Sequence, residues 1–379
     1  MNNSRLSKPI TIGNLKLHHR IGMASLTRFR ASDDHVPVDM MTEYYGQRSS
    51  VVGTLLISEG TLVSQADSGM DNVPGIWNPT QVDAWRKITD RVHANGCYII
   101  CQLWAFGRAA IPEVMAREGF PVIGPDAIPM DSSAPTPQRL STSGVREKIQ
   151  DYVNAAKNAI AAGFDGVEIH GAGGFLVDQF TQDVSNQRND EYGGSIENRS
   201  CFAVELTKAI ADAIGSDKVG IRLSPFGTFQ GMGMRDPIPQ FSDLITKLGQ
   251  LKLAYLHLVE ARIRGTEEIE TPETPETLDF AYDLWDRTFL INGGYKVDSA
   301  QRLVDVERPD KDIVVVFGRY FISTPDLPFR VLRGLEFTPY NRATFYHAKS
   351  AEGYIDYPFS PEFLQQSSQQ QIVYRASWA

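Results

Sequence analysis

Residues 165–199 read DGVEIHGAGGFLVDQFTQDVSNQRNDEYGGSIENR. The short run Val167–Ile169 is typical of a buried strand, and this strand is expected to end at His170. Three glycines follow within four positions, so the backbone there bends sharply or is closely approached by another group. An ionisable ring where a strand gives way to a glycine-rich loop is typical of a barrel active site. The alternative is that His170 only caps the strand and satisfies backbone groups.

Eight apolar runs of strand length are spread along the whole chain. Most are continuously apolar rather than alternating, which is expected of strands that are covered on both faces. The eight runs are Arg20–Ala24, Thr54–Glu59, Tyr98–Leu103, Asp165–His170, Lys218–Leu223, Tyr255–Val259, Phe289–Asn292 and Ile313–Phe317.

Helical patterns separate these runs. The clearest covers Val145–Ala162, where apolar residues recur at offsets of three, four and seven, and Gly163 follows as a C-terminal cap. The same pattern recurs over Asn198–Ile214, Phe241–Leu251 and Ser299–Val306. Alternation of strand and helix over eight strands predicts a (β/α)₈ TIM barrel, an α/β fold. An open doubly wound sheet would carry a glycine fingerprint after its first strand, and residues 24–27 contain none.

Three further segments are predicted to complete this barrel. Pro9–Leu17 alternates around Gly13-Asn14, which predicts an N-terminal β-hairpin that plugs one end. Long loops follow strand three, including Pro121–Pro137, and strand five, over Ser224–Gln240. Because long loops in a compact domain are usually functional, we expect both to roof a pocket. The acidic run Glu267–Glu276 is expected to be a solvated loop, and residues 1–379 to form a single domain.

Composition excludes several classes of function. The formal net charge is −9 and no basic stripe exists, so nucleic acid is not an expected partner. No apolar run approaches the roughly 20 residues that span a membrane, and the first ten residues lack the apolar core of a signal peptide. Three cysteines are an odd and sparse set that suggests a reducing compartment without a disulfide framework. We therefore expect a soluble cytoplasmic protein.

In such barrels the working residues come from the carboxyl ends of the strands and the loops after them. These positions hold Ser25 and Thr27, Glu59 and Gly60, Gln102 and Trp104, His170, Arg222, Glu260, Gly293 and Gly294, and Gly318 and Arg319. Hydroxyl, amide, imidazole and two guanidinium groups are thereby predicted to converge on one rim.

The ends of strands seven and eight suit a phosphate group. Gly293-Gly294 and Gly318-Arg319 offer bare backbone N–H groups and a cation, in the two loops where these barrels usually bind phosphate. Arginine also matches phosphate geometry with two parallel hydrogen bonds. The alternative is that the glycines only make tight turns and Arg319 pairs with an acid.

Other strand ends suit a flavin ring. The amide of Gln102 can donate and accept at once, which matches the edge of a flavin pyrimidine ring. Thr27 can donate to an electron-accepting ring atom, and Arg222 can place positive charge where a reduced, anionic flavin is negative. A metal site is discounted, because of seven histidines only His170 and perhaps His257 lie on suitable strands.

At this point the sequence resembles the old yellow enzyme family, FMN-dependent ene-reductases on a (β/α)₈ barrel. The likeness covers roughly residues 8–359 and is carried by ordered matches. They include His19–Ala24, Leu56–Gly60, Gln102–Trp104, Asp165–His170, Asn189–Arg199, Phe317–Phe321 and Glu352–Pro358. Two segments, Cys101–Ala110 and Gly318–Phe329, most resemble the sequences of the fungal subgroup that acts on chanoclavine aldehyde in ergot alkaloid pathways.

The resemblance implies a role for each matched position. Ser25, Leu26, Thr27, Gly60 and Gln102 would hold the FMN ring, with Thr27 near its redox-active nitrogen. Arg222 would lie by the pyrimidine oxygen, and Gly293, Gly294, Gly318 and Arg319 would hold the phosphate. His170 would donate to the substrate carbonyl, and Trp104 and Tyr346 would line the pocket. NADPH or NADH would be the reductant and a small enal or enone the substrate.

The chain departs from the family pattern at three positions. The family usually has proline where Ser25 stands, a change expected to carry little chemical weight. It usually has His or Asn, the second donor to the substrate carbonyl, at the position of Gly173. It usually has tyrosine, the acid that protonates the substrate carbon, at the position of Phe175. Phenylalanine has no proton to give.

Three hypotheses follow from these departures. The first is an FMN enzyme that isomerises a bulky enal such as chanoclavine-I aldehyde, because Gly173 vacates volume and Phe175 cannot protonate. The second is an ordinary ene-reductase with a substitute acid such as Tyr346. The third is a catalytically silent flavin-binding barrel. The oligomeric state is expected to be monomer or homodimer.

Overall fold

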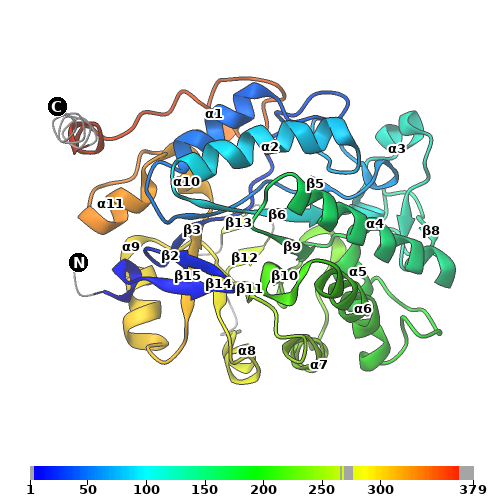
Figure 1. The fold of residues 1–379 in the computed structure, drawn as a ribbon. Coiled ribbons are helices and arrows are strands. Elements are labelled where there is room, and N and C mark those ends of the chain that lie inside the picture. The colour runs from blue at the N-terminus through cyan, green and yellow to red at the C-terminus, as the bar shows by residue number, and fades with distance from the viewer. Residues whose placement is uncertain (1–3, 265–266, 269–275, 367–379) are drawn as a thin grey trace.

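The computed structural model describes residues 4–264, 267–268 and 276–366. Its centre is a closed barrel of eight parallel strands (Figure 1), as the sequence predicts. The strands are β3 (Ile21–Met23), β4 (Leu55–Ile57), β6 (Tyr98–Trp104), β9 (Gly166–Gly171), β10 (Val219–Leu223), β11 (Tyr255–Val259), β14 (Phe289–Asn292) and β15 (Ile313–Phe317). Neighbours pair in chain order, and pairing of β15 with β3 closes the ring. A short strand, β5 (Thr61–Leu62), extends the sheet beside β6.

The strand register places the polar residues of the strand ends side by side. In β9 every residue is buried, and His170 is the Cα partner of Arg222 in β10. On the other side of β9, Glu168 is the Cα partner of Gln102 in β6. Since parallel strands end at the same edge, the sequence order of these strands alone brings an imidazole, a guanidinium and an amide together.

Helices surround the barrel on all sides in Figure 1. They are α1 (Asp39–Arg48), α2 (Pro79–Ala94), α3 (Pro112–Glu118), α4 (Thr142–Ala161), α5 (Leu176–Thr181), α6 (Ile196–Ile214), α7 (Ile238–Gly249), α8 (Asp279–Leu284), α9 (Val297–Arg302), α10 (Arg319–Ser323) and α11 (Leu327–Arg333). Helices α4, α6 and α7 confirm three of the predicted ones, and the predicted Ser299–Val306 is divided between α9 and a π-helical turn at Leu303–Glu307. Gly163 has the left-handed φ of +90° that its predicted cap requires. No described helix is both long and apolar enough to cross a membrane.

The N-terminal hairpin closes one end of the barrel, as predicted. Strands β1 (Ile10–Ile12) and β2 (Leu15–Leu17) pair in antiparallel fashion around a two-residue turn. At Gly13 φ is +54°, and a Cβ there would lie 2.0 Å from the Asp217 carbonyl oxygen, so only glycine fits the turn. Ile10 packs in one apolar cluster with barrel residues such as Leu290. The hairpin lies beside the segments that lead into β10 and β11, which is the amino end of the strands.

The two long loops are joined to each other over the opposite end. The first carries α3 and the short parallel pair β7 (Ile123–Gly124) and β8 (Gln138–Arg139). The buried guanidinium of Arg108 in this loop donates to backbone carbonyls of both loops. Its acceptors are Ile128 (3.3 Å), Pro129 (3.2 Å), Gln230 (3.4 Å) and Gly231 (3.1 Å). The strand-five loop therefore has a defined position above the barrel. Most of the acidic run Glu267–Glu276 lies outside the described residues, as do the side chains at 263–264 and 267–268.

Candidate active site

A cavity of about 480 Å³ opens at the carboxyl ends of the strands. The predicted residues that line it are Ser25, Leu26, Thr27, Gln102, Trp104, His170, Gly173, Phe175, Arg222, Gly293, Gly294, Gly318, Arg319 and Tyr346. Gly60 is not among the lining residues. A Cβ on Gly60 would lie 2.3 Å from the Trp104 ring, so this glycine lets the indole pack against the backbone behind it.

His170 faces this cavity from the end of β9. Its side chain is buried, and its Nδ1 atom has no hydrogen-bond partner among the residues that the structure describes. Burial lowers the pKa of the imidazole well below its usual range, and the positive charge of Arg222 lowers it further. The ring is therefore neutral at physiological pH. A neutral imidazole in a dry site can donate one hydrogen bond to a ligand but is a poor source of protons.

The amide and guanidinium groups form the polar side of the cavity. Ser25 Oγ donates to Gln102 Oε1 at 2.7 Å, and Gln102 Nε2 donates to Glu168 Oε1 at 2.8 Å. The Arg222 Nε atom is buried without a partner among the described residues. The Ser25 bond differs from the expectation that serine at this position has little chemical weight, because its hydroxyl holds the amide predicted to bind the flavin edge.

Aromatic rings form the opposite side. Phe175 lies at the N-terminal end of α5, and its ring centroid is 4.7 Å from Trp104, 5.5 Å from Phe106 and 4.9 Å from His170. All three contacts are edge-on, the arrangement that aromatic quadrupoles favour. None of these neighbouring rings carries a hydroxyl group. At the position where the resembled family has its acid, this chain therefore has a phenyl ring, which packs against the rings of Trp104, Phe106 and His170.

The turn between β9 and α5 leaves space beside Phe175. Gly173 has φ of +66°, and its N–H donates to Ser224 Oγ at 2.9 Å. A Cβ on Gly173 would meet only the Phe175 ring, at 3.6 Å. The cavity therefore extends to the backbone at the position where the family carries a second donor.

The glycine-rich end lies where strands β14 and β15 give way to their loops. Gly294 has φ of +69°, a conformation that favours glycine, and a Cβ on Gly293 would lie 2.4 Å from the Glu260 side chain. The Arg319 guanidinium is 5.8 Å from the centre of the Tyr340 ring. Lys296 also lines this cavity and adds a second cation.

Tyr346 reaches the cavity from the C-terminal segment. Its side chain is 50% exposed, and its ring centroid is 5.4 Å from that of Phe29. Two buried arginines hold the segment by backbone carbonyls: Arg28 Nε and Arg30 Nη1 both donate to the Phe345 carbonyl, at 3.1 and 2.8 Å. This half-exposed tyrosine is accordingly at the open side of the cavity.

Several lining residues were missed by reasoning from strand ends. They are Phe29, Met70, Phe106, Phe229, Gln230, Asn292, Tyr295, Lys296, Tyr320, Arg342 and Phe345. Asn292 could have been found, since it ends the predicted seventh strand. Phe229 and Gln230 belong to the strand-five loop that was expected to roof the pocket, whereas Phe106 belongs to the loop after strand three. The remaining residues come from segments with no periodic signal.

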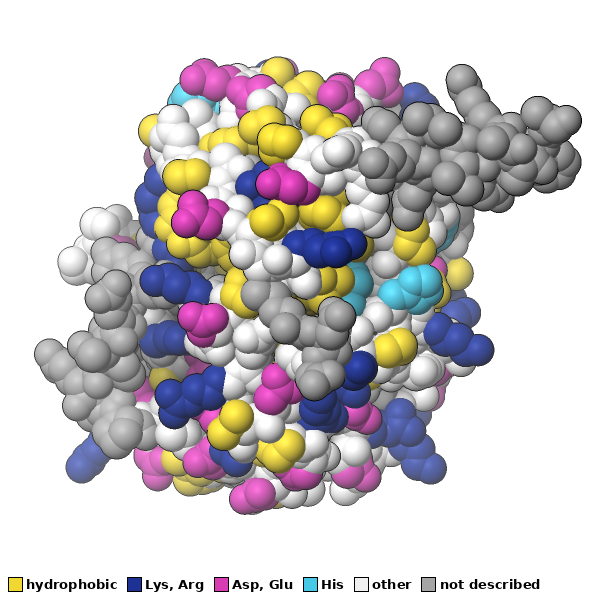
Figure 2. Space-filling model, turned by 90° about the vertical axis from the view of Figure 1, so that its left-hand side faces the viewer, with side chains coloured by type: hydrophobic (Ala, Val, Ile, Leu, Met, Phe, Trp, Pro, Cys, Tyr) yellow, Lys and Arg dark blue, Asp and Glu magenta, His cyan; other side chains and the backbone are white. Residues whose placement is uncertain are grey.

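The described part of the chain contains no cluster of side chains suited to a metal ion. No group of three or more His, Cys, Asp or Glu side chains there could hold a metal ion. On the face shown in Figure 2, Lys and Arg side chains (dark blue) are mixed with Asp and Glu side chains (magenta), so charges of both signs are spread over this face.

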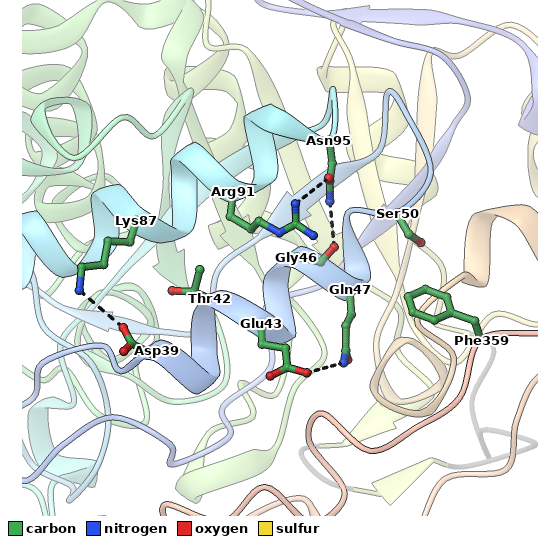
Figure 3. A pocket seen from close by; sticks show the side chains of 10 residues that line it. All are labelled: Asp39, Thr42, Glu43, Gly46, Gln47, Ser50, Lys87, Arg91, Asn95 and Phe359. Carbon is green, nitrogen blue, oxygen red and sulfur yellow. Dashed lines mark hydrogen bonds and ion pairs between the residues drawn. The ribbon is translucent and has the colours of Figure 1, made fainter. Parts of the chain in front are cut away.

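A second hollow, of about 710 Å³, lies on the surface between α1, α2 and Phe359 (Figure 3). Its polar groups pair with one another: Lys87 is 3.5 Å from Asp39, and Arg91 donates to Asn95 at 3.3 Å. It contains none of the predicted site residues. The smaller cavity at the strand ends is therefore the candidate active site.

Comparison with known proteins decides the family. The NADH:flavin oxidoreductase / NADH oxidase family matches residues 5–337. The chain belongs to this family. Family membership makes the protein an FMN-dependent oxidoreductase with a nicotinamide reductant, and confirms the cofactor predicted from the sequence.

Individual relatives narrow the likeness within the flavin oxidoreductases. A protein of Penicillium roqueforti (strain FM164) named chanoclavine-I aldehyde reductase fgaOx3 is 50% identical, over 95% of this chain and 98% of that relative. A Claviceps purpurea (strain 20.1) protein named probable inactive dehydrogenase easA is 46% identical, over 98% and 100%. The crystal structure of old yellow enzyme from Pichia sp. AKU4542 superposes with a TM-score of 0.88 at 38% identity, over 95% of both chains. The predicted resemblance and fold class are confirmed.

The residues around the cavity fit FMN. A buried guanidinium nitrogen of Arg222 and a buried imidazole nitrogen of His170 have no hydrogen-bond partner in the part of the chain that the structure describes, as expected of groups that face a ligand. Gly293 and Gly294 offer backbone that side chains would obstruct or strain, with two cations nearby. Cationic groups and free backbone N–H groups suit the phosphate of FMN.

Proposed function

We propose that the protein uses FMN to isomerise a bulky α,β-unsaturated aldehyde of a fungal alkaloid pathway, as an enzyme of the old yellow enzyme type. In this proposal Ser25, Leu26, Thr27, Gln102 and Arg222 hold or flank the ring, Gly60 supports the ring site from behind Trp104, and Gly293, Gly294, Gly318 and Arg319 hold the phosphate. His170 and Thr27 act in catalysis, and Phe175 occupies the position of the family's proton donor. Gly173, Trp104 and Tyr346 shape the substrate pocket.

His170 would bind the substrate carbonyl. When bound, FMN supplies hydride chemistry, whereas the protein supplies placement and electrostatics. The neutral His170 ring donates one hydrogen bond to the carbonyl oxygen, which stabilises negative charge that develops there. Arg222, buried beside it, stabilises negative charge on the ring it faces. Because Gly173 has no side chain, His170 is the sole donor expected from the turn.

Phe175 would determine the outcome of the reaction. After hydride reaches the β-carbon, the former double bond is single and free to rotate. Since the Phe175 ring and its aromatic neighbours offer no acidic hydroxyl, the α-carbon would stay unprotonated and the hydride could return from the β-carbon to the oxidised flavin. The double bond then re-forms with the other geometry, and no reducing equivalent is consumed. This aromatic environment of Phe175 is the observation that carries the proposal.

Two alternatives have specific support. One relative is named an aldehyde reductase, which favours net saturation of the double bond, with Tyr346 as a substitute acid. Against it, Tyr346 is half exposed at the open side of the cavity. Another relative is named a probable inactive dehydrogenase, which favours a silent flavin-binding barrel. The presence of all four polar side chains, Thr27, Gln102, His170 and Arg222, argues against a catalytically silent protein.

Analysis of the products formed by the wild-type protein distinguishes the isomerase, the reductase and the silent barrel. Reduced enzyme is mixed with chanoclavine-I aldehyde under anaerobic conditions, with NADPH in excess, and the products are separated by chromatography before their masses are measured, because an isomer has the same mass as its substrate. Isomerisation predicts a product without two added hydrogens and little NADPH oxidised per substrate. A product two hydrogens heavier at one NADPH each would establish the reductase instead, and unchanged substrate would establish the silent barrel.

Three wider expectations accompany this proposal. We infer that residues 1–379 work as one FMN-binding barrel domain, which the single closed barrel supports. The substrate is expected to be a small molecule, in keeping with the size of the cavity. A cytoplasmic location, and a monomeric or homodimeric state, stay predictions from the sequence.

A further inference from the structure

A buried carboxylate lies behind the polar side of the cavity and has no place in the mechanism above. Glu168, in the middle of β9, is fully buried in the barrel. Gln102 Nε2 donates to its Oε1 atom at 2.8 Å. Tyr255 OH, at 3.1 Å, and His257 Nδ1, at 2.8 Å, both meet its Oε2 atom. The network continues from His257 Nε2 to Asn292 Oδ1, at 3.0 Å.

This network fixes the orientation of the Gln102 amide from both ends. An ionised carboxylate can only accept, so the Gln102 NH₂ group must face Glu168. The Oε1 atom then faces Ser25, whose hydroxyl donates to it at 2.7 Å. A side-chain amide without such partners can turn over and exchange its donor for its acceptor. With both partners present, Gln102 offers the cavity one defined set of remaining donor and acceptor sites.

Glu168 also carries charge toward the cavity. Burial alone would raise its pKa, but His257, Arg222 and Gln102 together hold the pKa below its ordinary value. Burial lowers the pKa of His257, although Glu168 opposes that effect. Glu168 is therefore anionic at neutral pH. Its charge offsets part of the positive charge of Arg222, the group predicted to face the reduced flavin.

We propose that Ser25 and Glu168 are cofactor-positioning residues, which hold the Gln102 amide in one orientation toward FMN and, through Glu168, moderate the positive charge at the flavin ring. This inference rests on FMN occupying the cavity, as in the proposed function. Neither residue needs to touch the substrate. Ser25 stands where the family usually has proline, so the hydroxyl contact is a property of this chain.

The test measures FMN itself rather than turnover. Wild type is first freed of flavin and titrated with FMN; absence of binding would overturn the proposed function. Ser25→Ala is then expected to raise the dissociation constant of FMN about three- to tenfold, the worth of one hydrogen bond. Unfolding of the flavin-free variant by urea should be unchanged. Ser25→Thr, which keeps the hydroxyl, should restore wild-type affinity.

Glu168→Gln tests the charge. Removal of a negative charge favours the reduced, anionic flavin, so reduced FMN should bind at least about tenfold more tightly relative to oxidised FMN. For a two-electron couple this shifts the midpoint potential by about +30 mV. Tyr255→Phe is the matched control, since it removes one hydrogen bond to Glu168 but leaves the charge and Gln102 in place. It should keep the wild-type potential.

Three results would overturn the inference while wild type still binds FMN. One is an unchanged dissociation constant in Ser25→Ala, which decides the matter even if Glu168→Gln fails to fold. Another is a loss of affinity in Ser25→Thr equal to that in Ser25→Ala. The third is a shift of potential in Tyr255→Phe as large as in Glu168→Gln.

Discussion

His170 shows how surroundings set the role of one residue. Burial and the neighbouring Arg222 hold its pKa well below the usual range, so the imidazole is a neutral donor rather than an acid. Its Nδ1 atom is buried and has no hydrogen-bond partner among the described residues. A neighbouring contact of equal importance, from Ser25 to Gln102, could not be predicted, because it depends on the relative height of two strands that are not adjacent.

Substitution of His170 should slow only the half-reaction in which the substrate oxidises the reduced enzyme. In His170→Ala, FMN binding and reduction by NADPH should stay near wild type, whereas oxidation of the reduced enzyme by the enal should slow about 100-fold, as for a lost oxyanion donor. Stopped-flow absorbance measures both half-reactions. His93→Ala, at a surface histidine that pairs with Asp165, is the control and should change neither. Equal slowing of both half-reactions in His170→Ala would contradict the assigned role.

Asp178, beside the Phe175 turn, predicts a pH-dependent stability. Burial raises the pKa of this carboxyl to about 7, although Gln182 and the Gly174 N–H donate to it. The folded state therefore binds the proton more tightly than the unfolded state, and stability falls as pH rises from about 4 to about 7. In Asp178→Asn the slope of unfolding free energy against pH should become more positive, by up to about 1.4 kcal/mol per pH unit. Urea unfolding of wild type and Asp178→Asn at pH 5, 6 and 7 measures this slope. An unchanged slope in the variant would refute the role assigned to Asp178.

At the scale of elements, the strands follow from sequence because their apolar runs are long and continuous. Each predicted strand lies within a residue or two of an observed one, since burial on both faces leaves little freedom. Helix α1 has a weak apolar stripe and was not predicted. Helix α2 was missed although its apolar face, with Trp85, Ile88 and Val92 buried, is as marked as that of α4. Helix α5 begins directly after Phe175, and its six residues are too few to show a helical period.

Arg108 ties two long loops that sequence treats separately. Its guanidinium donates to four carbonyls, so Arg108→Ala should lower the free energy of unfolding by about 2–3 kcal/mol and expose the 224–233 loop to protease. Arg146→Ala, which removes an exposed ion pair with Glu191, should cost less than about 1 kcal/mol. Urea unfolding and limited proteolysis compare them. Equal stability of the two variants would show that Arg108 does not hold the loops together.

At the scale of the whole molecule, closure of the barrel brings groups from all parts of the chain to one cavity. The polar rim was predictable because parallel strands end at the same edge, whereas the aromatic wall depends on loop conformations that no periodic pattern encodes. FMN binding is the property that needs the entire assembly.

The purified protein should therefore be yellow and release FMN on denaturation. Arg319→Ala should raise the dissociation constant of FMN at least about tenfold, because it removes a charge-assisted phosphate contact. Arg333→Ala, at a surface arginine near Phe329, should leave it unchanged. Fluorescence titration of the flavin-free protein measures both. A colourless protein that takes up no added FMN would contradict the account at this scale.

Phe175→Tyr tests the central claim most directly. A tyrosine hydroxyl with an ordinary pKa near about 10 is protonated at neutral pH and can serve as general acid. The swap adds one hydroxyl to a ring that already faces the cavity, so the fold should persist. Wild type and variant are given the same aldehyde and NADPH, and their products are separated by chromatography, which distinguishes an isomer from its substrate, and compared by mass spectrometry. The account predicts an isomerised product of unchanged mass from wild type and a product two hydrogens heavier from Phe175→Tyr. A saturated product from wild type, with one NADPH oxidised per substrate, would contradict it.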